Sequence, residues 1–200
     1  YVYRDTISLP MACADWVFEW ASCCRNAATT NLLDPDTHGY SVIAQLNNLS
    51  GGNSSPVFQE LQMPFTCTNA MYCIDNTAYD ADGDSLVYSM VNPVDDTGLP
   101  LVYNMPFSVA DPFPSVNGHT FDATTGNHCA VPTTAGAWVM AYKVEEYRNG
   151  VLVGSAVRDI EIWTSFCASA VLDFAGTVTD TLGNPVTAGM VELYEYGLNA

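Results

Sequence analysis

Apolar and polar residues in this chain follow the two-residue period of β-strands, and helical periodicity is almost absent. Residues 15–22 (DWVFEWAS) alternate apolar and polar side chains at several positions and are aromatic. Residues 41–49 (SVIAQLNNL) and 85–91 (SLVYSMV) are short stretches bounded by polar loops. Aromatic and β-branched side chains fit a pleated, half-buried surface. We therefore predict a strand in each of these three ranges.

The clearest pattern lies in residues 135–164, where two long strand-like stretches flank Asn149-Gly150. This residue pair is typical of a type I′ hairpin turn, because both central positions need a positive φ. A similar arrangement surrounds Gly183-Asn184-Pro185 in residues 175–196. We predict a hairpin around each turn.

Many short strands, separated by turn signals about every eight to twelve residues, predict an all-β chain of sandwich modules. We expect disulfide-stapled tandem Ig-like or cadherin-like β-sandwiches. Residues 1–66 are expected to form a partial Ig-like module with its early strands upstream. Residues 67–168 would form an Ig/cadherin-like sandwich, and residues 169–200 would begin a further Ig-like module. The chain is expected to be a piece of a longer polypeptide.

The charge balance narrows the choice of partners. Five Lys and Arg residues stand against 22 Asp and Glu residues, which gives a formal net charge of −17 at pH 7. Such a chain repels the phosphates of nucleic acids and anionic lipid surfaces. No apolar run is long enough for a membrane span, so we predict no membrane insertion. The negative charge favours binding of multivalent cations. The alternative interpretation is that the charge only keeps the chain soluble.

Seven cysteines predict an oxidising, extracellular setting. They are Cys13, Cys23, Cys24, Cys67, Cys73, Cys129 and Cys167. No CxxC pair suggests a zinc site, and the irregular spacing suits disulfides. The odd count predicts one free thiol or a partner outside these residues. We expect the adjacent Cys23 and Cys24 to bond different partners, because a bond between neighbours is strained.

The segment YDADGDSLVYS (79–89) places Asp80, Asp82 and Asp84 at alternating positions around a glycine. It is not an EF-hand, because the glycine falls fourth rather than sixth and the twelfth residue is a valine rather than a glutamate. Carboxylates at alternate positions can still gather around Ca²⁺ when a glycine bends the loop. Asp75, Asn76 or the Glu145-Glu146 pair are candidates to complete the shell. The alternative is a solvated acidic turn that leads into a strand.

No catalytic constellation is visible, and we predict no enzymatic activity. His38, His119 and His128 lie outside any HExxH motif, and there is no GxSxG elbow or phosphate-binding loop. We expect these histidines to be structural. Arg25 and the Arg158-Asp159 pair are expected to tie strands or loops together by charge-assisted hydrogen bonds.

Several blocks, taken in order, resemble a known family of surface proteins. They are CADWVFEWASCCRNAATTNL (13–32), GGNSSPVF (51–58), PFTCTN (64–69), AYDADGDSLVYSMVNP (78–93), FDATTGNHCAVPTTAG (121–136) and VEEYRNGVLVGSAVRDIEI (144–162). This order resembles a module of large secreted proteins of Bacteroidota, described as gliding-motility-associated or PKD-domain proteins and exported by the type IX secretion system. The resemblance covers residues 1 to about 167. The tail AGTVTDTLGNPVTAGMVELY (175–194) resembles the start of a carboxypeptidase-regulatory-like Ig module.

The resemblance adds two expectations about single residues. Cys73 and Cys129 depart from the pattern of the family, and two extra cysteines favour a Cys73–Cys129 disulfide. Thr6, Ser85 and Thr181 fit the Asp-Ser/Thr-apolar pattern of O-glycosylation in Bacteroidota, so they are candidate glycan acceptors.

The resemblance implies a non-enzymatic, structural or adhesive module of a bacterial surface adhesin, stalk or filament. Its expected partners are other modules or copies of the same protein, with a polymer joined through open sheet edges as one arrangement. The alternative is a carbohydrate-binding module or an accessory module of a secreted hydrolase. Surface polysaccharide would then be the ligand, and the candidate sugar platforms are Trp16, Trp20, Trp138 and Trp163.

Overall fold

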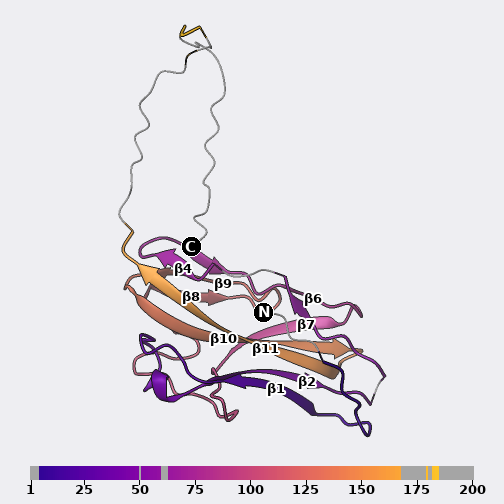
Figure 1. The fold of residues 1–200 in the computed structure, drawn as a ribbon. Coiled ribbons are helices and arrows are strands. Elements are labelled where there is room, and N and C mark those ends of the chain that lie inside the picture. The colour runs from indigo at the N-terminus through magenta and orange to yellow at the C-terminus, as the bar shows by residue number, and fades with distance from the viewer. Residues whose placement is uncertain (1–4, 50, 60–62, 168–178, 180–181, 185–200) are drawn as a thin grey trace. The chain divides into compact units, whose positions relative to one another are not determined.

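The computed structural model describes residues 5–49, 51–59, 63–167, 179 and 182–184, and the chain divides into two compact units, Tyr1–Cys167 and Ala168–Ala200. The first unit is all-β apart from one short 3-10 helix among the described residues (Figure 1). Its elements are β1 (Trp16–Ser22), η1 (Pro35–Thr37), β2 (Tyr40–Leu46), β3 (Val57–Phe58), β4 (Phe65–Cys67), β5 (Tyr72–Ile74), β6 (Ala78–Tyr79), β7 (Ser85–Val91), β8 (Ser115–Phe121), β9 (His128–Pro132), β10 (Gly136–Arg148) and β11 (Val151–Ser165). No helix in the described ranges is long and apolar enough to cross a membrane.

The described strands of the first unit form three sheets. The largest has six strands: five run in the order β1-β2-β11-β10-β7, and β4 pairs in parallel with the end of β11. A three-stranded sheet has the order β5-β9-β8, and β3 pairs with β6. Among the pairings between these strands, that of β4 with β11 is parallel and the others are antiparallel.

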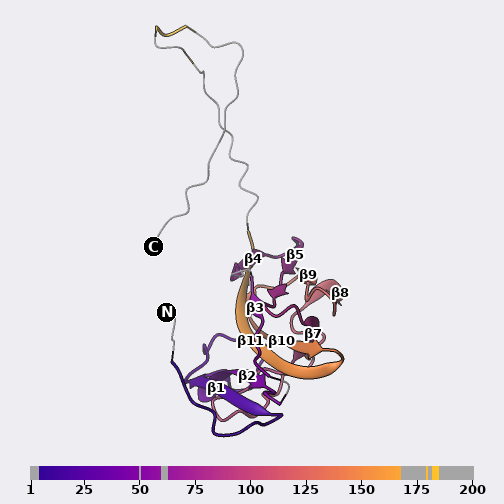
Figure 2. The same cartoon turned by 90° about the vertical axis from the view of Figure 1, so that its right-hand side faces the viewer.

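The β10–β11 hairpin is the longest pairing in the structure. Its ladder joins Gly136–Arg148 to Val151–Thr164, with one register shift at Glu146/Tyr147. Asn149 and Gly150 have φ values of 51° and 80°, as the predicted turn requires. Figure 2 shows how strongly this hairpin curves.

Both faces of β10 are buried, and each meets a different set of side chains. Trp138, Met140 and Tyr142 point to one face, where they pack against Ile74, Phe113, Ala130 and Ile162. This cluster joins the six-stranded sheet to the three-stranded sheet. On the other face Val139 contacts Leu32, Leu101 and Tyr103, which lie in loops. Burial on both sides explains why the apolar run at 137–142 shows no alternation.

The first unit does not divide at residue 66, where we predicted a module boundary. Ala44–Leu46 of β2 pair with Gly154–Ala156 of β11, so strands from both predicted modules share one sheet. Backbone hydrogen bonds between distant segments leave no visible trace in local sequence, which is why linker-like composition misplaced this boundary. The second unit begins at Ala168, and the strands predicted within it lie outside the described residues.

A single buried amide ties a loop to the centre of β10. Asn31 is fully buried, and its Nδ2 donates to the carbonyl oxygens of Pro112 and Val139, both at 2.8 Å. Its Oδ1 accepts from the Val139 N–H at 3.0 Å. The side chain thereby satisfies three backbone groups on the loop-covered face of the sheet.

Replacing Asn31 with Ala would leave these buried backbone groups without partners. We expect the free energy of unfolding to fall by about 2–4 kcal/mol, since each orphaned buried group costs about 1–3 kcal/mol. Urea denaturation followed by tryptophan fluorescence measures this change. Asn127→Ala, at an exposed position, is the matched control and should change stability by less than about 0.5 kcal/mol. Equal losses in the two variants would contradict the role of Asn31.

Candidate functional site

The acidic segment between β6 and β7 folds into a compact turn. Asp80 Oδ1 accepts hydrogen bonds from the backbone N–H groups of Asp82 (3.1 Å) and Asp84 (2.7 Å). Gly83 has a φ of 78°, which bends the chain back toward Asp80. Asp82 turns outward and accepts from the Ser54 N–H at 2.6 Å. The three alternating aspartates therefore do not converge on one point.

Two side chains of β10 complete the acidic cluster. Glu146 and Arg148 lie two residues apart and belong to the strand that pairs with β7. The Arg148 guanidinium donates to both oxygens of Asp84, with Nε–Oδ1 at 2.9 Å and Nη2–Oδ2 at 2.6 Å. Such a bidentate pair fixes both side chains. It places Glu146 beside the aspartates of the turn.

Asn53 attaches a third segment to the same cluster. Its Nδ2 donates to Glu146 Oε2, and its Oδ1 accepts from Arg148 Nη2 at 2.8 Å. Arg148 Nη1 also donates to the Gly52 carbonyl oxygen at 3.0 Å. Residues 52–54 are therefore held against β10 by polar contacts.

The cluster carries unbalanced negative charge. Carboxylate oxygens of Asp80, Asp84 and Glu146 lie within 4.8 Å of one another. The pKa of Glu146 is raised to about 7, chiefly by burial; the three aspartates contribute to this rise, and the hydrogen bond from Asn53 opposes it. Asp80 Oδ2 and Glu146 Oε1 are buried without a hydrogen-bond partner. A hard cation is the chemical species that such oxygen atoms bind.

The structure places the other predicted ligands elsewhere. Asp75 Oδ1 accepts from the Thr77 N–H at 2.8 Å, and hydrogen bonds to Thr77 lower the pKa of Asp75. Glu145 pairs with Lys143 at 2.5 Å, and both belong to the face of β10 opposite Glu146. Asn76 is buried and donates to the Gly126 carbonyl oxygen at 2.9 Å. Glu146, rather than its neighbour, meets Asp80 and Asp84 because side chains alternate along the strand.

Three disulfides are present among the described residues. They are Cys23–Cys24, Cys67–Cys167 and Cys73–Cys129, and Cys13 is free. The Cys73–Cys129 bond joins opposed residues of β5 and β9, and it is the pair favoured by the resemblance. Such bonds are consistent with an extracellular or secreted protein.

The expectation that Cys23 and Cys24 bond different partners is wrong. The two neighbouring cysteines bond each other. The other two disulfides use four of the remaining five cysteines, and the thiol of the fifth, Cys13, donates to Asp15 Oδ1 at 2.9 Å.

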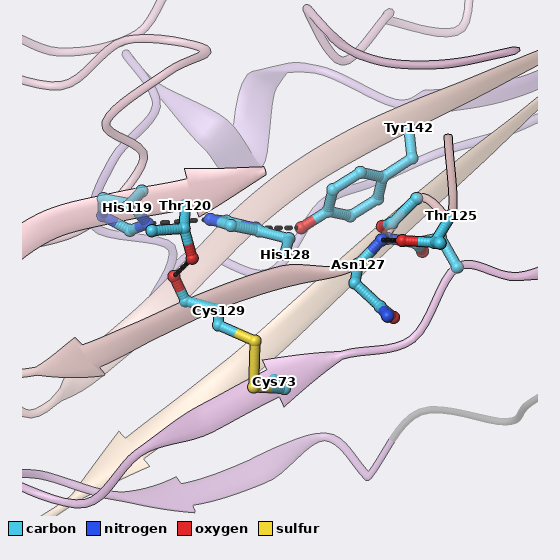
Figure 3. The surroundings of a disulfide bond; sticks show 10 residues. Cys73, His119, Thr120, Thr125, Asn127, His128, Cys129 and Tyr142 are labelled. Carbon is cyan, nitrogen blue, oxygen red and sulfur yellow. Dashed lines mark hydrogen bonds between the residues drawn. A yellow bond between two sulfur atoms is a disulfide. The ribbon is translucent and has the colours of Figure 1, made fainter. Parts of the chain in front are cut away.

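A chain of hydrogen bonds runs beside the Cys73–Cys129 bond (Figure 3). His119 Nε2 faces two acceptors, the Phe113 carbonyl oxygen at 2.8 Å and Asp111 Oδ1 at 3.2 Å, so it holds the proton. His119 Nδ1 then accepts from His128 Nε2 at 2.8 Å. His128 Nδ1 in turn accepts from the Tyr142 hydroxyl at 2.6 Å. The His119, His128 and Tyr142 side chains thereby form one continuous hydrogen-bonded chain.

The predicted structural arginine forms a buried ion pair. Arg25 Nη1 and Nη2 donate to Asp159 at 3.1 and 2.6 Å, and Nη2 also donates to the Val94 carbonyl oxygen at 2.9 Å. These contacts connect the segment after β1 with β11 and the loop after β7. Arg158 lies over the Phe58 ring at 5.3 Å.

The tryptophans differ sharply in exposure. Trp138 is buried and donates to Thr164 Oγ1 at 2.8 Å, so it cannot serve as a sugar platform, and Trp16 is half-buried. Trp20 and Trp163 are 44% and 38% exposed. Trp20 lines an open hollow of about 760 Å³ on β1, β2 and β11. Its lining residues are Asp5, Phe18, Glu19, Trp20, Val42, Ile43, Ala44, Ala156 and Val157.

Two of the candidate glycan acceptors are accessible. Thr6 and Ser85 are exposed, whereas Thr181 lies outside the described residues. The side chain of Asp84, next to Ser85, is only 4% exposed. A glycan on Ser85 and a ligand at Asp84 would therefore lie on opposite sides of the chain.

No protein-family model, curated protein or solved structure matches this chain.

The buried histidine pair predicts a specific loss of stability in acid. Burial and, to a smaller extent, the neighbouring His119 lower the pKa of His128 to about 4, against 6.5 in the unfolded chain. Between these values the unfolded chain binds a proton that the folded protein excludes, so stability falls as the pH falls. The expected loss from His128 is about 3 kcal/mol between pH 7 and pH 4.

Urea denaturation of the wild type and of His128→Gln at pH 7 and pH 4 isolates this effect. Carboxylates titrate equally in both proteins, and glutamine does not titrate. We expect the wild type to lose about 3 kcal/mol more than the variant. Equal losses would show that His128 takes up its proton in the folded state as easily as in the unfolded chain.

Proposed function

We propose that this chain is a non-enzymatic, extracellular structural or adhesive module of a large bacterial surface protein, such as a stalk or filament. In this proposal the first unit is a module of the Ig-like or cadherin-like sandwich class. The observation that supports it best is the Cys67–Cys167 disulfide, which joins residues 100 positions apart.

This disulfide provides a second covalent path through the first unit. Tension applied between a residue before Cys67 and a residue after Cys167 passes through the sulfur atoms. The residues between them, which include β5 to β11, are then bypassed. They cannot be extended by that tension, whatever happens to their fold. A module that transmits force in a stalk gains most from such an arrangement.

The strands next to this disulfide meet tension in a resistant geometry. β4 runs parallel to the end of β11, with Phe65, Thr66 and Cys67 opposite Trp163, Thr164 and Ser165. Tension pulls the start of β4 and the end of β11 in opposite directions along the strands. The hydrogen bonds between them are then stressed together rather than one after another. Among these bonds are Trp163 N–H to the Pro64 carbonyl at 2.6 Å and Thr68 N–H to the Ser165 carbonyl at 2.8 Å.

Sheet edges and charge suggest the partners. β1 and β7 are the two end strands of the five-strand series in the six-stranded sheet. An end strand can pair with a strand of another module or of another copy of the chain, which is how a polymer would form. The net charge of −17 would keep neighbouring stalks apart at low ionic strength.

Force spectroscopy tests the mechanical proposal. With the whole chain held by its two ends, the Cys67→Ser/Cys167→Ser variant should release about 145–160 Å more contour length on unfolding than the wild type. The Cys73–Cys129 bond, intact in this variant, still closes 56 of the 100 residues between Cys67 and Cys167, so only the others are extended.

The control variant is Cys73→Ser/Cys129→Ser, which removes a disulfide from within the bypassed segment. It should release the same length as the wild type, because that segment stays closed by the outer disulfide. Equal lengths for the wild type and the Cys67→Ser/Cys167→Ser variant would rule out the covalent bypass.

Carbohydrate binding is a second candidate, supported by the exposure of Trp20 in the hollow on β1, β2 and β11. An accessory module of a secreted hydrolase would bind its polysaccharide in such a place. Retention on insoluble cellulose, chitin and xylan tests this candidate. Trp20→Ala should reduce retention at least about tenfold, as expected for the loss of a stacking ring. Trp163→Ala, at a similarly exposed tryptophan outside the hollow, is the control, and no retention of the wild type would exclude the candidate.

A further inference from the structure

We propose that Asp80, Asp84 and Glu146 bind a Ca²⁺ ion between the β6–β7 turn and β10. This inference does not depend on the proposed function. It differs from the simple expectation of a loop site, because its ligands come from two segments far apart in the sequence. Asp82, the central residue of the acidic turn, is outside the ligand set.

The free lone pairs of the cluster identify the ligand atoms. Asp80 Oδ1 already accepts two backbone hydrogen bonds, and Glu146 Oε2 accepts one from Asn53. Their other oxygens, Asp80 Oδ2 and Glu146 Oε1, are buried and have no partner. Asp84 binds Arg148 through both oxygens, but each carboxylate oxygen can accept from two directions. Each of the three residues therefore has an oxygen available.

Burial makes these unpartnered oxygens costly without a cation. Glu146 is fully buried, and Asp80 is only 8% exposed. A buried polar atom with no partner destabilises a fold, and a buried charge does so far more. The Asp80, Asp84 and Glu146 carboxylates lie together, with Asp82 at the edge of the cluster, and the guanidinium that pairs with Asp84 at 2.6 Å and with Asp82 at 3.4 Å is that of Arg148 alone. A divalent cation would remove most of the remaining imbalance.

The donor set favours calcium among the divalent cations. All available ligand atoms are carboxylate oxygens, which suit hard cations rather than zinc or copper. One oxygen of each residue lies within 4.8 Å of the others, so all three can contact a single ion. Ca²⁺ accepts several carboxylates in a flexible geometry, whereas Mg²⁺ demands near-ideal octahedral geometry and usually keeps several waters. A buried set of three protein carboxylates therefore suits calcium better.

Calcium at this position would join three segments of the fold. Asp80 and Asp84 belong to the turn before β7, and Glu146 belongs to β10. Asn53 hydrogen-bonds Glu146 directly and so couples the 52–54 segment to the same ion. The ion would therefore fix the β6–β7 turn and residues 52–54 against the central hairpin.

Isothermal titration calorimetry of the whole chain with CaCl₂ tests the site. We expect one ion per chain with a Kd of about 0.1–1 mM, the range of extracellular calcium modules. At about 100 times the Kd, Tm should rise by roughly 5–10 °C. MgCl₂ at the same concentration should raise it less.

Glu146→Gln and Asp80→Asn should each weaken calcium binding at least about tenfold, because each removes a charged ligand. The glutamine amide is neutral, so we expect Glu146→Gln to fold without calcium and to keep the circular dichroism of the wild type. Asp122→Asn is the matched control and should bind calcium normally. Asp122 also accepts a backbone N–H within a turn, that of Thr124 at 2.8 Å, but it is exposed.

Three results would overturn the proposal. The first is an unchanged Tm with no heat of binding, which would mean that protons or Arg148 alone neutralise the cluster. The second is equal calcium binding by the wild type, Glu146→Gln and Asp80→Asn, which would indicate diffuse attraction to the acidic surface. The third is an equal response to magnesium.

Discussion

The backbone ladder between β10 and β11 is the interaction on which the rest of the first unit depends. β10 also pairs with β7, and β11 also pairs with β2 and β4, so this hairpin connects all the strands of the largest sheet. The Asn149-Gly150 turn sets its register, because both residues adopt the positive φ that a tight hairpin needs. A slip of one residue would exchange the two faces of β10. The apolar core and the acidic cluster would both be lost, since each is built on a particular face.

One face of β10 therefore supplies both the apolar core and part of the acidic cluster. Trp138, Met140 and Tyr142 belong to the core, and Glu146, four residues after Tyr142 on the same face, meets the aspartates. The rigid backbone of one strand positions both groups of side chains. Core packing positions the strand, and the strand positions a carboxylate that no loop could hold as firmly. The buried His128–Tyr142 hydrogen bond belongs to the core side and adds a polar constraint there.

Local features of the sequence predicted local features of the fold. The strand at Ser85–Val91 and the hairpin turn at Asn149-Gly150 agree with the predicted positions, because residue type and alternation determine both. The pairing of β2 with β11 was not predictable, since it joins segments more than 100 residues apart. Compact units consequently differ from the predicted modules.

The acidic site, too, was predictable from the sequence only where its residues are neighbours in the chain. Asp80 and Asp84 stood out in the sequence because of their spacing around Gly83. Glu146 was named only as one of a pair, and its selection over Glu145 required the register of β10 against β7. The His119–His128–Tyr142 chain was missed altogether. The alternating burial in HCAVP places His128 on the inner face of β9, but it is visible only in the structure, because Cys, Ala and Val are all apolar.

The Cys67–Cys167 bond also changes what a protease can achieve. The loop between β7 and β8 carries the most exposed apolar side chains of this region, with Met105 at 91% exposure and Val102 at 69%. A cut there would open the backbone but would not separate the residues before Cys67 from those after Cys167, because the sulfur bridge still joins them. Both new ends would also remain attached, one through each cysteine. The molecule would continue to connect whatever lies on its two sides after its main chain had been severed.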